Sequence, residues 1–157
     1  MTYPQPLLIT TGAVSPPVAV VAPPPTVTAA HESAALWRES GRAGKRSRTP
    51  PIGTTISFVL NEPAKVTFSF TQRVVGRVSR RSCVPLTRRN NGRRGCMRWA
   101  TVAGLSLAGQ TGANTVFFQG RLPGGRRLRP GHYTLVILAT SAAGLLSTPT
   151  SVTFTIR

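Results

Sequence analysis

The chain has 157 residues, of which 40% are hydrophobic, and it carries twenty basic residues against three acidic ones, for a net charge of +17. This length and composition suit one folded domain with an extension. The three carboxylates, Glu32, Glu39 and Glu62, are scattered, and neither histidine has an obvious acid to orient it. General acid–base and nucleophilic catalysis need such pairs, so we expect no catalytic residues and no cofactor.

The positive charge has two interpretations. A strongly basic chain attracts polyanions such as nucleic acid, teichoic acid or acidic lipid. Eighteen of the twenty basic residues are Arg, however, and an Arg-, Ala-, Gly- and Pro-rich composition is also what a GC-rich genome tends to produce whatever the function. The charge by itself does not choose between a selected surface and a compositional bias.

Residues 1–25 contain seven of the fourteen prolines and no charged residue. Such a stretch favours extended polyproline II, so we predict a disordered linker over 1–25 and a folded domain over 26–157. No apolar run reaches the ~18 residues that a membrane span needs. The first basic residue is Arg38, which argues against a signal peptide here. We expect export to be directed from upstream of this sequence; the alternative is a protein that is not exported.

The first elements are short. Residues 27–33 fit a strand, residues 34–39 fit a helical turn or a continuation of that strand, and residues 41–51 form a basic loop. Apolar residues then alternate with others over 54–60 and again over 66–71, on either side of the turn-forming sequence Asn61-Glu62-Pro63. This pattern predicts a hairpin with one buried face and one face in water.

An Arg-rich insertion follows over residues 73–98, then a strand near 101–107, a Gly turn over 109–112 and a strand that contains Val116 and Phe118. Pro130-Gly131 begins a final hairpin, because both residues favour turns. About seven short strands without a helical period predict an all-β protein, a two-sheet antiparallel β-sandwich. Phe117 must then point outward. The alternation assigns to the core Phe58, Leu60, Val66, Phe68, Val116, Phe118, Tyr133, Leu135, Phe154 and Ile156.

Several segments carry a resemblance to a known class of domain. Residues 51–68, the two cysteines, residues 112–122 and the closing unit Leu128-x-Pro-Gly-x-Tyr-x-Leu resemble the bacterial immunoglobulin-like or fibronectin-type-III-like C-terminal domains of exported proteins from high-GC Gram-positive bacteria. The resemblance covers about residues 26–157. It implies an Ig-like sandwich and a type of module, without family-wide catalytic residues. One departure is Gly144-Leu145-Leu146, which places two apolar side chains on a loop and suggests a small contact surface.

The two cysteines, Cys83 and Cys96, flank a run rich in Arg, Asn and Gly inside the insertion. Two cysteines in an exported β-domain predict a disulfide. Closing a loop of this length stabilises a fold by about 3 kcal/mol on the chain-entropy model. Two free buried thiols and a metal site remain alternatives. Zinc needs four ligands, and only His31 and His132 could join the cysteines, without the usual spacing.

Nine arginines lie between Arg73 and Arg98, and Trp99 follows them. Base-stacking platforms need several aromatic residues, so sequence-specific nucleic-acid recognition is poorly supported and a generic electrostatic patch fits better. We assign Trp37 and Trp99 to partly buried core positions, with a ligand platform as the alternative. The candidate polyanion-binding residues are Arg80, Arg81, Arg88, Arg89, Arg93, Arg94 and Arg98.

We therefore expect a non-catalytic, monomeric β-sandwich module, secreted or at the cell surface, as the C-terminal part of a larger protein. Its role would be spacing, cell-envelope association or contact with another protein, so its partner is an unknown protein or an envelope polymer. The alternative is a polyanion-binding module that binds nucleic acid or acidic glycan through the insertion, which we expect to be a solvated Arg-rich loop. A third option is an accessory domain of an enzyme.

Overall fold

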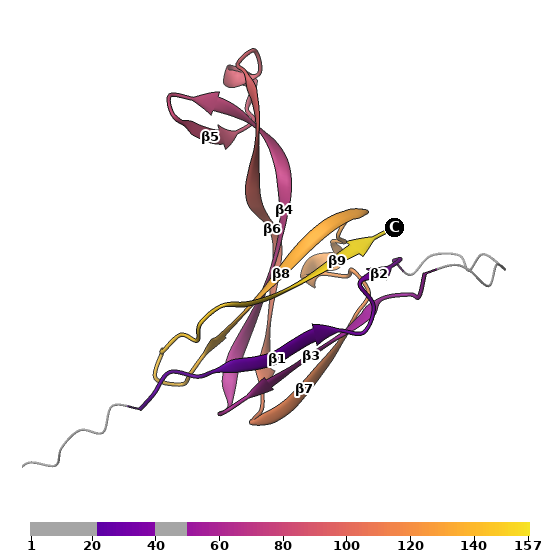
Figure 1. Cartoon of the computed structure of the whole chain (residues 1–157), viewed down its shortest axis with the longest axis vertical. Coiled ribbons are helices and arrows are strands. Elements are labelled where there is room, and N and C mark those ends of the chain that lie inside the picture. Colours follow the sequence, from indigo (N-terminus) through magenta and orange to yellow (C-terminus); the bar gives the residue numbers. More distant parts are fainter. Residues whose placement is uncertain (1–21, 40–49) are drawn as a thin grey trace, which may run out of the picture.

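The protein is seen in a computed structural model, which describes residues 22–39 and 50–157. Two β-sheets pack face to face in these residues (Figure 1). The smaller sheet has the order β1-β3-β7, and the larger has the order β2-β9-β8-β4-β5 with β6 on the other side of β4. This architecture confirms the predicted all-β sandwich. The strands are β1 (Val27–Glu32), β2 (Leu36–Trp37), β3 (Thr54–Leu60), β4 (Ala64–Ser79), β5 (Ser82–Pro85), β6 (Gly95–Gly109), β7 (Gly112–Phe118), β8 (Gly131–Thr140) and β9 (Thr150–Ile156).

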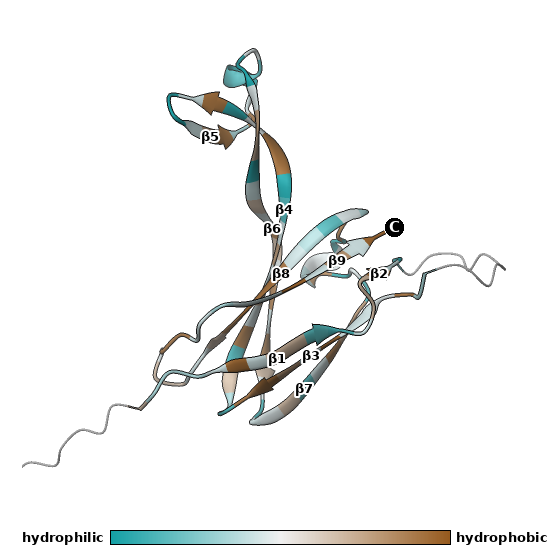
Figure 2. Ribbon diagram, in the orientation of Figure 1, coloured by the Kyte–Doolittle hydropathy of each residue, from teal (hydrophilic) through white to brown (hydrophobic). Residues whose placement is uncertain are grey.

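The core fills the space between the two sheets. Every predicted core residue is buried except Val116, which is half-buried and packs against the others. Phe117 points outward as predicted and is 62% exposed. Hydrophobic and more hydrophilic residues alternate along several strands (Figure 2). Successive side chains of a strand point to opposite faces, so this alternation fits a sheet with one buried face. In the part of the chain that the structure describes, no helix is long and apolar enough to cross a membrane.

The predicted hairpin between residues 54–60 and 66–71 is wrong. β3 pairs with β1 and β7, whereas β4 pairs with β6 and β8, so the turn at Asn61–Pro63 carries the chain from one sheet to the other. The apolar faces of β3 and β4 meet across the core, where the rings of Phe58 and Phe68 lie 5.9 Å apart in an edge-to-face contact. Alternation requires only that each strand bury one face, and a sandwich satisfies this requirement as well as a hairpin does.

The predicted closing hairpin is confirmed. β8 and β9 pair antiparallel from Gly131 with Ile156 to Ile137 with Thr150. At the start of β8, the Tyr133 hydroxyl donates a hydrogen bond to the Arg129 carbonyl over 2.7 Å. A Tyr that closes back on the preceding turn in this way is typical of Ig-like sandwiches. The two turn residues that lie between, Pro130 and Gly131, are those that the sequence singled out.

The ambiguous segment 34–39 contains a short strand. β2 lies parallel to β9 at the edge of the larger sheet, so the chain changes sheets after β1. Trp37 is fully buried and packs against Phe118 and Phe154, which places it in the core as predicted. The predicted basic loop over 41–51 and the predicted linker over 1–25 lie almost entirely outside the described residues.

The Arg-rich insertion is not a loop between strands. β4 and β6 run beyond the sandwich and stay paired from Gln72 with Ala100 to Arg77 with Gly95, so residues 72–100 form a β-ribbon that rises from the body (Figure 1). We call this ribbon the arm. Near its tip, β5 occupies the edge of β4 that β8 occupies in the sandwich. Paired strands satisfy the backbone groups of this charged segment, so it has regular structure without a core.

Candidate functional site

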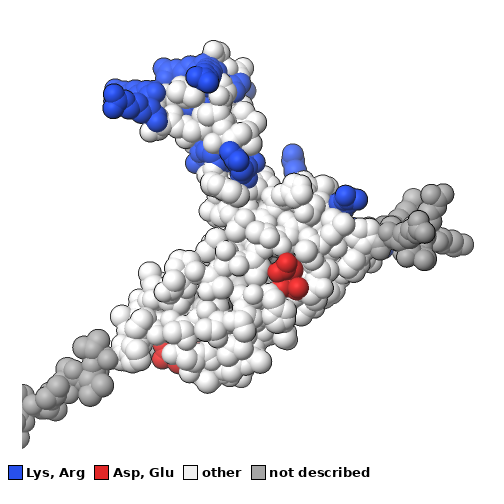
Figure 3. Space-filling view, in the orientation of Figure 1, with Lys and Arg blue, Asp and Glu red and all other residues white. Residues whose placement is uncertain are grey.

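The arm concentrates the positive charge of the protein. All nine arginines between Arg73 and Arg98 belong to it, and none of the three glutamates does. The blue Lys and Arg side chains gather over the arm in Figure 3, whereas the red acidic side chains lie on the body. A uniform compositional bias would spread basic residues more evenly over the described part of the chain; a second basic run, from Arg42 to Arg48, lies outside that part. The much longer described remainder holds only seven basic residues: Arg38, Lys65, Arg121, Arg126, Arg127, Arg129 and Arg157.

The structure brings six of the seven candidate arginines together at the tip of the arm. Arg80 and Arg81 form the turn between β4 and β5, Arg88 and Arg89 begin the 3₁₀ helix η1 (Arg88–Asn90), and Arg93 and Arg94 follow it. The seventh, Arg98, lies lower on β6, opposite Val74. Most of these side chains are exposed, so their guanidinium groups can reach a ligand in solution.

Hydrogen bonds give the tip a defined structure. The Arg77 Nε donates to the Asn91 carbonyl over 3.0 Å, and the Arg93 guanidinium donates to the Ser79 hydroxyl over 2.9 Å. The Asn90 amide group donates to the Pro85 carbonyl over 2.8 Å. These contacts fasten the segment around η1 to β4 and β5. The tip therefore presents its charges on a folded surface and not on a random coil.

The turn at the tip holds an arginine in an unusual conformation. Arg80 has a φ of 54°, in the left-handed region that glycine and asparagine favour. A residue other than glycine in this region costs about 1 kcal/mol or more. The chain thus has a long charged side chain in the β4–β5 turn, where a glycine would be less strained.

The predicted disulfide is present and clamps the arm. Cys83 on β5 and Cys96 on β6 are bonded, with their Cα atoms 6.0 Å apart. Because β4 lies between β5 and β6, the bond crosses over β4 at Gly76, which is directly opposite Cys96. A Cβ atom at Gly76 would lie 2.9 Å from the Cys83 Sγ and 2.5 Å from the Val84 carbonyl oxygen. Only glycine leaves room for the crossing at this position.

The two faces of the arm differ in chemistry because of a bulge. Phe70 is opposite Ala103 but Thr71 is opposite Thr101, so Val102 has no partner. Such an extra residue reverses the side-chain alternation of one strand relative to its partner. Beyond the bulge, Met97 and Trp99 share a face with Val75 and Arg73, on the side of β4 that faces away from the sandwich core.

The assignment of Trp99 to the core is wrong, because the bulge turns it outward. Its side chain is 61% exposed, and the neighbouring Val75 and Met97 are 54% and 48% exposed. Without the bulge, Trp99 would fall opposite Val74 on the other face of the ribbon. The sequence holds no signal for the bulge, since Val102 itself is an ordinary strand residue.

The remaining residues singled out in the sequence lie away from the arm tip. His31 on β1 and His132 on β8 are exposed, and nowhere in residues 22–39 and 50–157 do three His, Cys, Asp or Glu side chains gather as metal ligands do. Leu146, on the loop between β8 and β9, is 57% exposed, while the neighbouring Ser147 is buried and accepts a hydrogen bond from the Ala139 amide. The apolar loop is therefore anchored to the body with one leucine outward.

The arm can thus offer a dense array of guanidinium groups on a hydrogen-bonded ribbon that projects from the body. Guanidinium is always charged and donates paired hydrogen bonds to carboxylate and phosphate groups, so the arrangement suits anion binding. The chain matches no model of a known protein family and no curated protein sequence.

Proposed function

We propose that the protein is a non-catalytic, exported binding module that attaches to polyanions through its arm. The observation that carries the proposal is the segregation of charge: nine arginines and no carboxylate on a ribbon that stands clear of the sandwich. Like charges repel, so the ribbon gains little stability from its arginines apart from Arg77 and Arg93, which hold the tip together. An anionic partner that neutralises them accounts for their position.

Two further features support the proposal. The strained Arg80 keeps a charge at the tip at a cost in stability, and strained residues cluster at functional sites. The disulfide ties β5 to β6 across β4, in a part of the molecule that has no hydrophobic core of its own. Disulfides form and persist in oxidising compartments, which fits a secreted or cell-surface location. An anionic polymer of the cell envelope is then a suitable partner.

A test compares two variants that lose the same number of charges. The arm variant replaces Arg81, Arg88, Arg89 and Arg94 by Ser; these side chains are exposed, and Arg93 is kept because it holds the tip to Ser79. The control variant replaces four exposed arginines of the body by Ser: Arg126, Arg127, Arg129 and Arg157. Binding to duplex DNA and to heparin is measured over a range of salt concentrations.

We expect the arm variant to bind far more weakly than the control, although both carry the same net charge. For DNA, the slope of log K against log salt should become shallower by about 3 to 4, since each lost phosphate contact contributes ~0.9. If both variants weaken binding equally, the total charge and not the arm binds polyanions. The proposal then gives way to a module for spacing or for protein contact, for which Phe117 and Leu146 are exposed apolar candidates on the body.

A further inference from the structure

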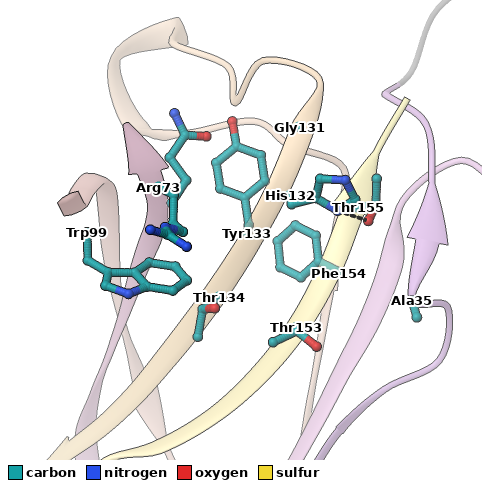
Figure 4. Close-up of a pocket in the computed structure, with 11 residues that line it drawn as sticks. Ala35, Arg73, Trp99, Gly131, His132, Tyr133, Thr134, Thr153, Phe154 and Thr155 are labelled. Atoms are coloured by element: carbon teal, nitrogen blue, oxygen red, sulfur yellow. Dashed lines mark hydrogen bonds between the residues drawn. The ribbon is translucent and has the colours of Figure 1, made fainter. Parts of the chain in front are cut away.

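A pocket at the foot of the arm gives the proposed polyanion site a second part. It has a volume of about 600 Å³ and lies where the arm leaves the larger sheet. Figure 4 shows Arg73 and Trp99 of the arm on one side of it, and His132, Thr134, Thr153 and Thr155 of β8 and β9 on the other. Clefts of this size hold small ligands or single units of a polymer.

The chemistry of the pocket is mixed. The exposed indole of Trp99 offers a flat apolar surface, and the hydroxyls of Thr134 and Thr153 offer both donors and acceptors. The His132 Nδ1 is engaged with the Thr155 hydroxyl at 2.8 Å, which leaves its other ring nitrogen for a ligand. Arg73 adds a positive charge next to the indole. This lining suits a ligand that is flat and apolar on one side, rich in hydroxyls at its rim, and anionic.

A sugar ring with an acidic substituent has these properties. Its C–H face packs on an aromatic ring, its hydroxyls bond to Thr and His, and its carboxylate pairs with the planar guanidinium of Arg. A nucleic-acid strand would instead need several aromatic platforms for successive bases. In the pocket and on the arm, Trp99 is the one exposed aromatic side chain among the described residues.

We propose that the pocket between Trp99 and the β8–β9 face binds one unit of an acidic polysaccharide whose chain continues along the arginines of the arm. This inference rests on the proposed function and names its ligand class. Arg73 and Arg77 are four residues apart on the same face of β4, about 13 Å at the usual strand rise. A polymer that leaves the pocket along this face passes Val75 and Met97 and then reaches Arg77, whose guanidinium group also bonds to Asn91 of the tip.

The experiment uses polygalacturonate, an acidic sugar polymer, and polyacrylate, which carries carboxylates without sugar rings. Tryptophan fluorescence reports the pocket directly, because Trp37 is fully buried and Trp99 is 61% exposed. Acrylamide, a neutral quencher, should reach Trp99 in the free protein and lose that access when polygalacturonate is bound. The variant Trp99→Ala identifies the signal, and Phe117→Ala, which removes an equally exposed aromatic from the other sheet, is the matched control.

We expect the protein to bind polygalacturonate more tightly than polyacrylate with the same number of carboxylates. Trp99→Ala should weaken polygalacturonate binding by about tenfold and leave polyacrylate binding unchanged, while Phe117→Ala should change neither. Equal affinity for the two polymers, or no effect of Trp99→Ala, would overturn the pocket and leave the arm proposal standing. Failure to bind either polymer would overturn both. Tighter binding of a single-stranded oligonucleotide, with Trp99 protected, would overturn the sugar ligand in favour of nucleic acid.

Discussion

Tyr133 shows how one hydrogen bond secures the start of β8. Its hydroxyl donates to the Arg129 carbonyl, and its ring lies 5.7 Å from that of Phe154. Tyr133→Phe keeps the ring and removes the hydrogen bond, so it should lower the free energy of unfolding by about 1 kcal/mol. Urea denaturation at neutral pH measures this difference. No loss of stability would show that this hydrogen bond does not stabilise the start of β8.

The same residue gives the protein a pH dependence. Burial raises the pKa of the Tyr133 hydroxyl above its ordinary value of ~10. Because the pKa is higher in the folded state than in the unfolded chain, the neutral Tyr133 hydroxyl contributes its full stability below pH ~10. This contribution is lost as the pH rises through the folded-state pKa. Above pH ~10 the wild-type protein should therefore lose stability faster than Tyr133→Phe. Parallel curves of unfolding free energy against pH would contradict this prediction.

The disulfide between Cys83 and Cys96 depends on the glycine at position 76. A methyl group there would press on the Val84 carbonyl and the Cys83 sulfur, and overpacking of this kind costs about 1–3 kcal/mol. Gly76→Ala should thus lower the fraction of disulfide at equilibrium in a glutathione buffer. Gly92→Ala is the control, since nothing lies within 4 Å of a Cβ atom at that position. Equal fractions of disulfide in the two variants would contradict the steric argument.

At the scale of elements, the disulfide belongs to the arm and not to the sandwich. None of the buried hydrophobic side chains of the core lies on the arm. The variant Cys83→Ser/Cys96→Ser should therefore lower the free energy of local unfolding of the tip by up to about 3 kcal/mol, while the body stays folded. Hydrogen exchange should speed up at the Val78 amide, which bonds to the Arg94 carbonyl. It should stay unchanged at core amides of β8. Faster exchange throughout the body would contradict this separation.

The elements that could be predicted from the sequence are those with local signals. Alternation identified the core side chains, and Pro130-Gly131 identified the closing hairpin, because both patterns arise within one strand or turn. The pairing of the strands could not be predicted. Apolar residues alternate with polar ones along β3 and β4 in the same way whether the strands pair side by side or face each other across a core. The arm could not be predicted for a related reason, since the pairing of β4 with β6 along the whole arm joins residues far apart in the sequence.

The sequence identified some features of the arm. The density of Arg over 73–98 marked the segment that forms the arm, and the disulfide between the two cysteines is confirmed. The exposure of Trp99 depends on the single unpaired residue Val102, which has no signature in the sequence, and the pocket depends in turn on Trp99. A cluster of like charges can be seen in a sequence, whereas the face on which a neighbouring side chain emerges is set by register.

At the scale of the molecule, the described residues divide into a body with a hydrophobic core and an arm with most of their net charge. The described body holds seven basic and three acidic residues, and the arm holds nine basic residues alone. Such an uneven distribution creates a field that draws an anionic partner to one end of the molecule before contact. Association with a polyanion should accordingly be fast at low salt and slow down steeply as salt is added.

Excision of the arm tests this division most directly. Gln72 and Ala100 are opposite each other on β4 and β6, so a two-residue Asn-Gly turn can join them in place of residues 73–99. The account predicts that the shortened protein unfolds cooperatively with the β-sheet circular dichroism of the parent, and that it no longer binds heparin at physiological salt. A shortened protein that folds and still binds heparin with the parent's affinity would contradict the central claim that the arm is the polyanion-binding element.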